Sequence, residues 1–158
     1  MAAASNAKIK GGDLMLFLGG VSVALATNHT LEISGETTDT SNKDQGGGMW
    51  ASSEVSKISW TITTENLYTI DGEGKEFSDL FTAMANGTQL DAVFATKLAT
   101  QASLTAVPEG GWQPVATVPK YSGKVVVTSL SLNAQNGEYA TYSATLTGVG
   151  ALTQATAQ

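Results

Sequence analysis

The stretch from Ser129 to Leu146 reads SLSLNAQNGEYATYSATL, two alternating runs of residues around an Asn-Gly pair. A two-residue Asn-Gly turn would place apolar and polar side chains together on both faces of the hairpin. A three-residue loop, Gln135 to Gly137, separates them, with Gly137 as the left-handed residue of a bulge. The register that follows has Leu132 opposite Ala140, Leu130 opposite Tyr142 and Val126 opposite Leu146.

This hairpin has one face made almost entirely of small polar side chains. Alternation along the two strands predicts that one face is core and that the other carries short, uncharged, hydrogen-bonding groups. The polar face consists of Ser129, Ser131, Asn133, Thr141, Ser143 and Thr145.

The composition bounds the kinds of function that are open to the chain. Its 158 residues suit one domain, residues 1–158, and it has no cysteine, which removes disulfides, thiolate metal sites and cysteine nucleophiles. The 8 basic residues are all Lys, against 14 acidic ones, giving a net charge of −6. A protein that grips phosphates would be basic, so specific nucleic-acid binding is not expected.

An apolar run near the start, Leu14 to Ala26, resembles the core of a secretion signal. Asp13 at its edge and Gly19-Gly20 in its middle argue instead for a hairpin of Leu14–Leu18 and Val21–Ala26, buried on both faces. The run is shorter than the roughly 18 apolar residues of a membrane span, and no membrane partner is expected.

Further strands are indicated by alternation at 30–38, 55–64 and 90–97, before the closing hairpin and its tail at 121–152. In the first, Leu31 and Ile33 share one face; in the second, Ile58, Trp60 and Ile62 point inward. One helix is expected from Glu76 to Asn86, ended by Gly87. Its stripe of Phe77, Leu80, Phe81 and Met84 is expected to be core.

These elements predict a mainly β fold: two packed antiparallel sheets forming a sandwich or barrel, with one short flanking α-helix. Three segments fall outside the regular elements. They are an extended N-terminal arm at residues 1–12, a long interaction loop at 39–53 and a Pro/Gly-rich excursion at 98–119. Long loops in compact domains are usually functional or disordered, and Met49 and Trp50 favour docking of the 39–53 loop.

No residue pattern indicates catalysis. His29 is the only histidine, so a three-histidine metal site cannot form, and a lone His lacks the partner base and orienting group of a nucleophile system. Acidic residues such as Glu32 and Glu36 lie on an exposed strand face rather than in a cleft. We expect no enzyme activity, no cofactor and no metal.

Four segments together carry a resemblance to a known family. They are, in order, GGDLMLFLGGVSVALATNHTLEISGETTDTSNKD, KISWTITTENLY, FSDLFTAMANG and YSGKVVVTSLSLNAQNGEYATYSATLTGVGALT. Over Gly11 to Leu152, apart from the Pro-rich excursion, the chain resembles the major tail tube proteins of long-tailed bacteriophages and prophages. The resemblance implies a two-sheet barrel-like fold with one flanking helix, and hexameric rings stacked into a tube that conducts the viral genome.

The resemblance also implies where the protein works and with what. It implies location in the virion tail after assembly in the host cytoplasm. The partners are other copies of the chain, the tape-measure, tail-terminator and baseplate proteins, and phage DNA that passes without specific binding. An inner-tube subunit of a contractile tail or secretion system, and a β-sandwich module for capsid decoration or carbohydrate binding, remain alternatives.

Two surfaces are candidates for assembly. The 39–53 loop is expected to lie against a neighbouring ring or subunit through Asp39, Lys43, Asp44, Met49 and Trp50. A lumen wall should carry neither a cluster of basic residues nor stacking aromatics, because both would hold a passing polyanion. Either the closing hairpin or the Thr30–Thr64 region supplies such a wall, the alternative being that these faces meet solvent on the tube exterior. The candidates are Glu32, Ser34, Glu36, Lys57, Ser59, Thr61, Thr63, Ser129, Ser131, Thr141, Ser143 and Thr145.

Overall fold

The computed structural model describes residues 8–44, 50–70, 74–97, 101, 104, 108, 111–114 and 120–155. Nearly all of its regular structure is β. The elements in chain order are a 3-10 turn (Gly11–Asp13), β1 (Leu14–Leu18), β2 (Val21–Ser22), β3 (Ala26–Asp39), β4 (Ser53–Leu67), α1 (Phe77–Asn86), β5 (Leu90–Thr96), β6 (Lys120–Asn133) and β7 (Thr141–Ala155).

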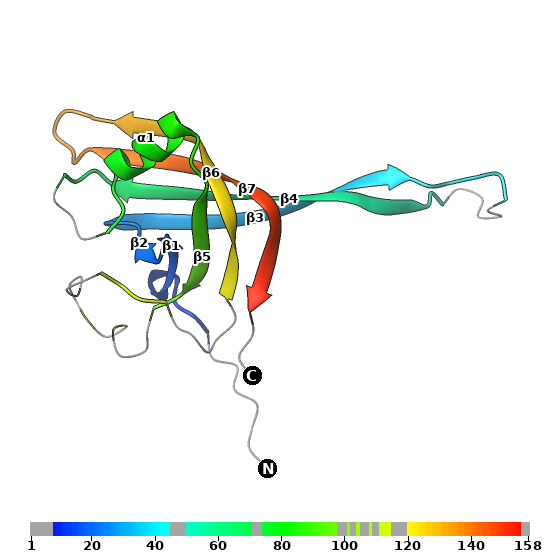
Figure 1. The fold of residues 1–158 in the computed structure, drawn as a ribbon, viewed down its shortest axis with the longest axis horizontal. Helices are drawn as coiled ribbons and strands as arrows, with labels where there is room; N and C mark the ends of the chain where they lie inside the picture. Colours follow the sequence, from blue (N-terminus) through cyan, green and yellow to red (C-terminus); the bar gives the residue numbers. More distant parts are fainter. Residues whose placement is uncertain are drawn as a thin grey trace, which may run out of the picture.

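In the described part of the chain, all strands belong to one antiparallel sheet of 7 strands in the order β2-β1-β5-β6-β7-β4-β3. The mainly β fold with one helix is therefore confirmed, but the two expected layers are parts of one continuous sheet. β6 and β7 run through both parts and turn sharply between them, so that β3 and β4 lie crosswise to β1 and β5 (Figure 1). Register shifts between Ser122 and Lys124 and between Val127 and Ser129 mark the bend.

Trp60 fills the inside of this bend. Its ring lies so close to Gly148 on β7 and Gly123 on β6 that a Cβ at either glycine would collide with it. The indole Nε1 donates a hydrogen bond of 3.0 Å to the carbonyl of Gly150, where the backbone adopts a φ of 75°. The bend therefore requires glycine for two reasons: close approach of the ring and a left-handed backbone.

The main core lies between the two parts of the sheet. It contains Trp60, Ile62, Val125, Leu146 and their buried neighbours from β1, β5 and α1. A second, smaller cluster lies on the opposite face of β1 and β5, where Met15, Phe17 and Ala95 pack against Trp112. The apolar character of both faces of β1 is thereby confirmed, and Trp112 from the expected surface excursion is buried. The second strand of the predicted hairpin is shorter than expected, because β2 ends at Ser22, Leu25 is exposed and Ala26 begins β3.

The helix α1 begins with a reciprocal capping box between Glu76 and Asp79 and ends at Gly87, whose φ is 65°. Leu80 and Ala83 are its buried residues. The expected core stripe is only half correct, because Phe81 is 58% exposed and Met84 is also exposed. A single helix seated on one edge of a sheet buries fewer positions than a helix that is covered on two sides.

The closing hairpin is displaced by two residues from the predicted register. Leu132 pairs with Tyr142 and Leu130 with Ala144, and the connection spans residues 134–140. Gly137 does lie in the left-handed region, with a φ of 88°. The carbonyl of Ala140 accepts a hydrogen bond from Tyr68 at the end of β4 instead of pairing with β6. A shift of two residues preserves the alternation, so the predicted faces hold.

We predict that Gly148→Ala lowers the free energy of unfolding by about 1–3 kcal/mol, because the added methyl group must displace the Trp60 ring. The measurement is urea unfolding followed by Trp fluorescence. Gly35→Ala is the matched control, since a Cβ at this strand position would lie 3.5 Å from Val55, an ordinary contact. Equal stability losses in the two variants would contradict the role assigned to Trp60.

Candidate functional site: a hydroxyl face and a projecting arm

One face of the sheet is lined by hydroxyl groups across four adjacent strands. The registers place Thr30 beside Thr63, Thr63 beside Thr145 and Thr145 beside Ser129, a row that crosses β3, β4, β7 and β6. The next row joins Asn28, Glu65, Ser143 and Ser131 in the same way. We call this surface the hydroxyl face.

The structure brings together the two polar surfaces that the sequence offered as alternatives. Strand alternation and register place all of the predicted lumen residues on the hydroxyl face: Glu32, Ser34, Glu36, Lys57, Ser59, Thr61, Thr63, Ser129, Ser131, Thr141, Ser143 and Thr145. Its charged residues are Glu32, Glu36, Glu54 and Glu65 with Lys57, so the face is acidic. The opposite face of the same strands carries Leu31, Trp60, Ile62 and Leu146 in the core.

The outer part of the β3–β4 hairpin projects from the body as an arm. β4 pairs with β7 only from Thr61 onward, so Ser53 to Trp60 pair with β3 alone. Figure 1 shows this two-stranded ribbon extending along the long axis of the molecule. We define the arm as residues 33–60, of which 45–49 lie outside the described part. An isolated two-stranded ribbon is marginally stable in water, so this arm needs a partner.

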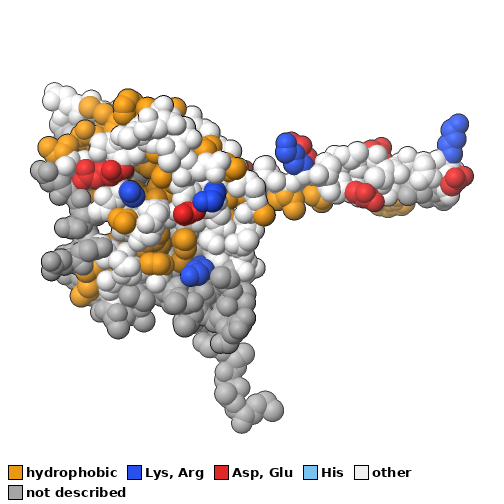
Figure 2. Space-filling view, viewed as in Figure 1, with side chains coloured by type: hydrophobic (Ala, Val, Ile, Leu, Met, Phe, Trp, Pro, Cys, Tyr) orange, Lys and Arg blue, Asp and Glu red, His pale blue; other side chains and the backbone are white. Residues whose placement is uncertain are grey.

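The arm is amphipathic. A bulge at Ser56 shifts the register between Glu36 and Thr37, and it places Val55 on the same side as Gly35, where an added Cβ would contact the Val55 side chain. The apolar side therefore carries Ile33, Val55 and Ile58, all exposed. Glu36 and Lys57 are register partners on the other side. Figure 2 shows apolar atoms along the lower edge of the arm near the body, with charged groups on the opposite edge there and on both edges further out.

This exposure corrects the prediction for Ile58. Alternation predicts that the residue points inward, yet it is 67% exposed. Its side chain is on the core side of the sheet, as alternation requires, but the core ends at Trp60. Alternation gives the face of a strand and does not show where the neighbouring strand stops, so the sequence could not reveal the arm.

A hollow of about 690 Å³ lies where the arm leaves the body. Its walls come from the arm and from the bent end of β7, including Ile58, Trp60, Tyr121, Gly148 and Leu152. The apolar side of the arm therefore continues into a hollow that is itself largely apolar, and a second chain could bury both together.

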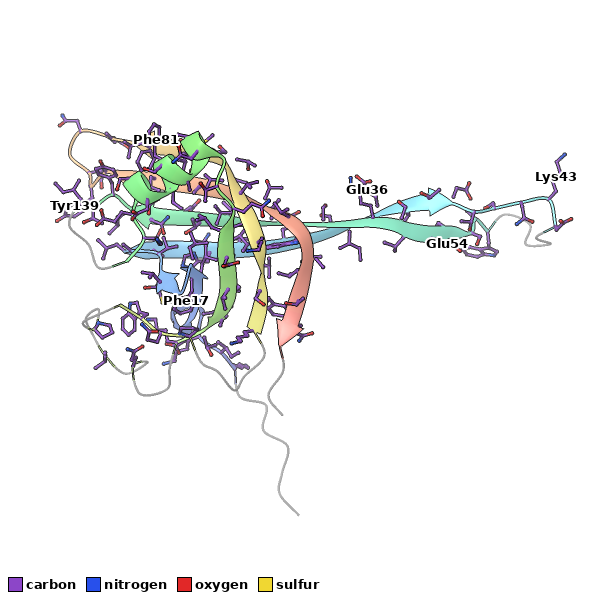
Figure 3. The ribbon with its side chains drawn as sticks, in the orientation of Figure 1. Phe17, Glu36, Lys43, Glu54, Phe81 and Tyr139 are labelled. Carbon is purple, nitrogen blue, oxygen red and sulfur yellow. The ribbon has the colours of Figure 1, made fainter. Side chains whose placement is uncertain are left out.

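The tip of the arm contains the four predicted interface residues that the structure describes, Asp39, Lys43, Asp44 and Trp50. Asp39 pairs with Ser53 as the last pair of the hairpin, and Lys43 and Asp44 are exposed beyond it. Trp50 is 89% exposed, whereas Met49 lies outside the described residues. Figure 3 shows Lys43 at one end of the molecule and Tyr139, on the β6–β7 connection, at the other.

Local hydrogen bonds order the part of the tip that the structure describes. The Ser41 hydroxyl and its backbone N–H donate to the Asp39 carboxylate and lower the pKa of that group. The Ser52 backbone N–H donates to Ser41 Oγ over 2.9 Å, and Thr40 N–H donates to the Ser52 carbonyl.

Two strand edges of the hydroxyl face are open. β3 is the last strand in the sheet order, so one side of its backbone has no neighbour in the sheet. Among the described residues, β6 pairs with β5 only from Tyr121 to Val125, so its second half, up to Asn133, has β7 as its one strand partner, although α1 packs against β6. The face therefore ends in an unpaired edge on each side.

A small polar cluster is buried directly behind the hydroxyl face. The Thr64 hydroxyl donates to Asn66 Oδ1 over 2.9 Å, so it accepts the 2.9 Å hydrogen bond from His29 Nδ1–H. His29 Nε2 is buried without a hydrogen-bond partner among the described residues, and its ring meets Phe94 edge-on. Burial lowers the pKa of His29 to about 4, because a second ring proton would place a positive charge out of contact with water.

Neither a metal cluster nor a membrane helix occurs in the described part of the chain. The described residues contain no group of three or more His, Cys, Asp or Glu side chains that could hold a metal ion. Within the same residues no helix has the length and apolarity needed to cross a bilayer.

Comparison with known proteins finds a matching family and similar solved structures. Residues 19–154 match the family model described as phage tail tube protein. A chain in the virion of a native gene transfer agent particle matches with a TM-score of 0.68 and 16% identity, covering 94% of this chain and 99% of that one. No curated protein matches the sequence.

Two other solved structures are similar. The tail of an empty gene transfer agent particle, determined with C6 symmetry, gives a TM-score of 0.67 at 17% identity, with 92% of this chain and 98% of that one covered. The SPP1 tail tube gives 0.63 at 9% identity, with 96% and 80% covered. At these identities the likeness to solved structures supports the fold.

We predict that acid destabilises the folded chain through His29. Its pKa is about 4 when folded and about 6.5 when unfolded, so the unfolded chain binds more protons between these values and stability falls as the pH falls through this window. The loss at pH 4 is about 3 kcal/mol, measured by urea unfolding at several pH values. His29→Asn keeps a donor for Thr64 and should flatten this part of the profile. An unchanged pH slope in that variant would contradict the assignment.

Proposed function

The chain belongs to the phage tail tube protein family, and we propose that its copies close into hexameric rings that stack into the tube through which phage DNA passes. The role is structural and non-enzymatic. The observation that carries the proposal is the continuous hydroxyl face, which is bounded by an open strand edge on each side and extended by an unpartnered arm.

Ring closure joins the two open edges. In a cyclic ring each subunit presents one edge to the next, and the β3 edge of one copy meets the second half of β6 in its neighbour. In the order β6-β7-β4-β3 each strand is antiparallel to its neighbour, so β3 runs opposite to β6. Cyclic symmetry keeps the neighbouring β6 in the same direction as the first, and the new junction is therefore antiparallel, like every junction within the subunit.

The hydroxyl face suits the inside of such a ring. When the edges close, the hydroxyl faces of all copies together form one continuous wall of the ring. Among the described residues of this face, Lys57 is the one cation. A wall of short hydroxyls and scattered carboxylates neither neutralises phosphates nor stacks on bases, so it lets a polyanion slide past. This supports the lumen assignment for all of the predicted residues.

Rings stack on one another through the two ends of the subunit's long axis. The arm and the β6–β7 connection project at opposite ends (Figure 3), and each carries a nearly fully exposed aromatic residue, Trp50 at 89% and Tyr139 at 86%. Rings stacked in one orientation bring the arm of one copy against the next ring, which covers its apolar side and the hollow at its base. Asp39, Lys43, Asp44, Met49 and Trp50 are the tip residues proposed to make this contact.

The remaining assignments follow from the family. We place the protein in the virion tail, assembled in the host cytoplasm, with tape-measure, tail-terminator and baseplate proteins as its further partners. No described feature favours a carbohydrate-binding module, because the two most exposed aromatic residues, Trp50 on the arm and Tyr139 on the β6–β7 connection, lie at opposite ends of the molecule.

We predict that Ile58→Asp leaves a folded subunit that does not form tubes, because it places a charge on the apolar side of the arm without touching the core. Ser59→Asp is the matched control: it adds the same acid at the adjacent exposed position on the opposite face, and it should still assemble. Circular dichroism reports folding and negative-stain electron microscopy reports tubes. Normal tubes from Ile58→Asp would refute the role of the arm.

A second prediction tests the lumen directly. The chain has no cysteine, so Thr145→Cys on the hydroxyl face and Thr82→Cys on α1 can each be labelled without background. In tubes, a maleimide coupled to a bulky polymer should react with the Thr82→Cys variant and not with the Thr145→Cys variant. Dissociated subunits of both variants should react. Equal labelling of Thr145→Cys in tubes and subunits would place the hydroxyl face outside the lumen.

A further inference from the structure

The chain contains two Asn-Gly pairs, Asn86-Gly87 and Asn136-Gly137, which lie in very different surroundings. The first closes α1. The Gly87 N–H donates to the carbonyls of Ala83 and Met84, and its φ of 65° belongs to the helix cap. The backbone nitrogen of Gly87 is therefore held by the helix end.

The second pair lies in the exposed connection between β6 and β7, residues 134–140. One hydrogen bond spans this turn, from Glu138 N–H to the Gln135 carbonyl over 3.2 Å. Among the described residues, neither the Asn136 side chain nor the Gly137 N–H has a hydrogen-bond partner. A Cβ at Gly137 would have nothing within 4 Å, so no neighbouring group crowds this position.

We propose that Asn136 is a site of spontaneous deamidation, a modification that the fold permits at Asn136 and prevents at Asn86. The backbone nitrogen of Gly137 loses its proton and forms a bond to Asn136 Cγ. The Cγ–Nδ2 bond breaks, and ammonia leaves with the proton. Water then opens the resulting five-membered imide at either carbonyl, giving aspartate or isoaspartate. The reaction needs only water and base, and a glycine at the next position leaves room for the attack.

The contrast between the two pairs follows from their hydrogen bonds. At Asn86 the attacking nitrogen must first leave the carbonyls of Ala83 and Met84, which requires local opening of the helix end. At Asn136 no such bond has to break. Conversion at Asn136 places a second carboxylate two residues from Glu138, and isoaspartate also lengthens the backbone of the turn.

The test is incubation of the folded, full-length protein at mildly alkaline pH and 37 °C, followed by peptide mass mapping and enzymatic detection of isoaspartate. We expect Asn136 to convert at least about tenfold faster than Asn86, a ratio equivalent to about 1.4 kcal/mol. Incubation in concentrated urea should bring the two rates together, because the helix cap is then lost. Conversion of Asn86 as fast as Asn136 in the folded protein, or no conversion of Asn136, would overturn the proposal.

Asn136→Gln is the matched variant. It keeps an amide at the same exposed position, but its longer side chain would have to form a less favourable six-membered ring. The incubated variant should not acquire the acidic form that isoelectric focusing resolves for the parent protein. An acidic form that appears at the same rate in both proteins would assign the reaction to another residue. The incubations use dissociated subunits, because the β6–β7 connection is one of the two ends proposed to meet in stacked rings.

Discussion

The packing of Trp60 against Gly148 and Gly123 is the constraint on which the rest of this fold depends. A flat sheet of seven strands could not enclose a core, whereas a sheet bent at β6 and β7 encloses one between its own parts. The indole supplies the apolar volume inside the bend, and the glycines give it room. Its hydrogen bond to Gly150 satisfies the buried N–H and ties β4 to the turn of β7.

The bend also separates the surfaces by role. On β3, β4, β7 and β6 one face is committed to the core, so the other is free to be polar across its whole width. On β1 and β5 both faces are covered, because Trp112 packs on the second one. The hydroxyl face is therefore wide and uninterrupted, which a barrel built from two separate sheets would not guarantee.

Sequence reasoning recovered what alternation and capping determine. The strands near 14–18, 30–38, 55–64 and 90–97, the end of α1 at Gly87 and the two faces of the closing hairpin all follow from local pattern. The errors concern long-range relations. The register of the hairpin depended on Tyr68 taking the Ala140 carbonyl, and the exposure of Ile58 depended on where β7 ends its pairing with β4. The sequence of either strand alone contains neither fact. That both polar surfaces form one face likewise became visible only with the order β6-β7-β4-β3.

The hydroxyl face is formed by an even number of strands, and this limits how such a protein can evolve. In the proposed ring, four antiparallel strands would bring β3 and the next copy's β6 together in opposite directions, whereas an odd count would force one parallel seam per subunit into an otherwise antiparallel cylinder. With this proposed closure, lineages that widen or narrow the channel by changing the subunit itself would be restricted to gaining or losing whole β-hairpins. Single-strand insertions would survive only in the part of the sheet that does not take part in closure.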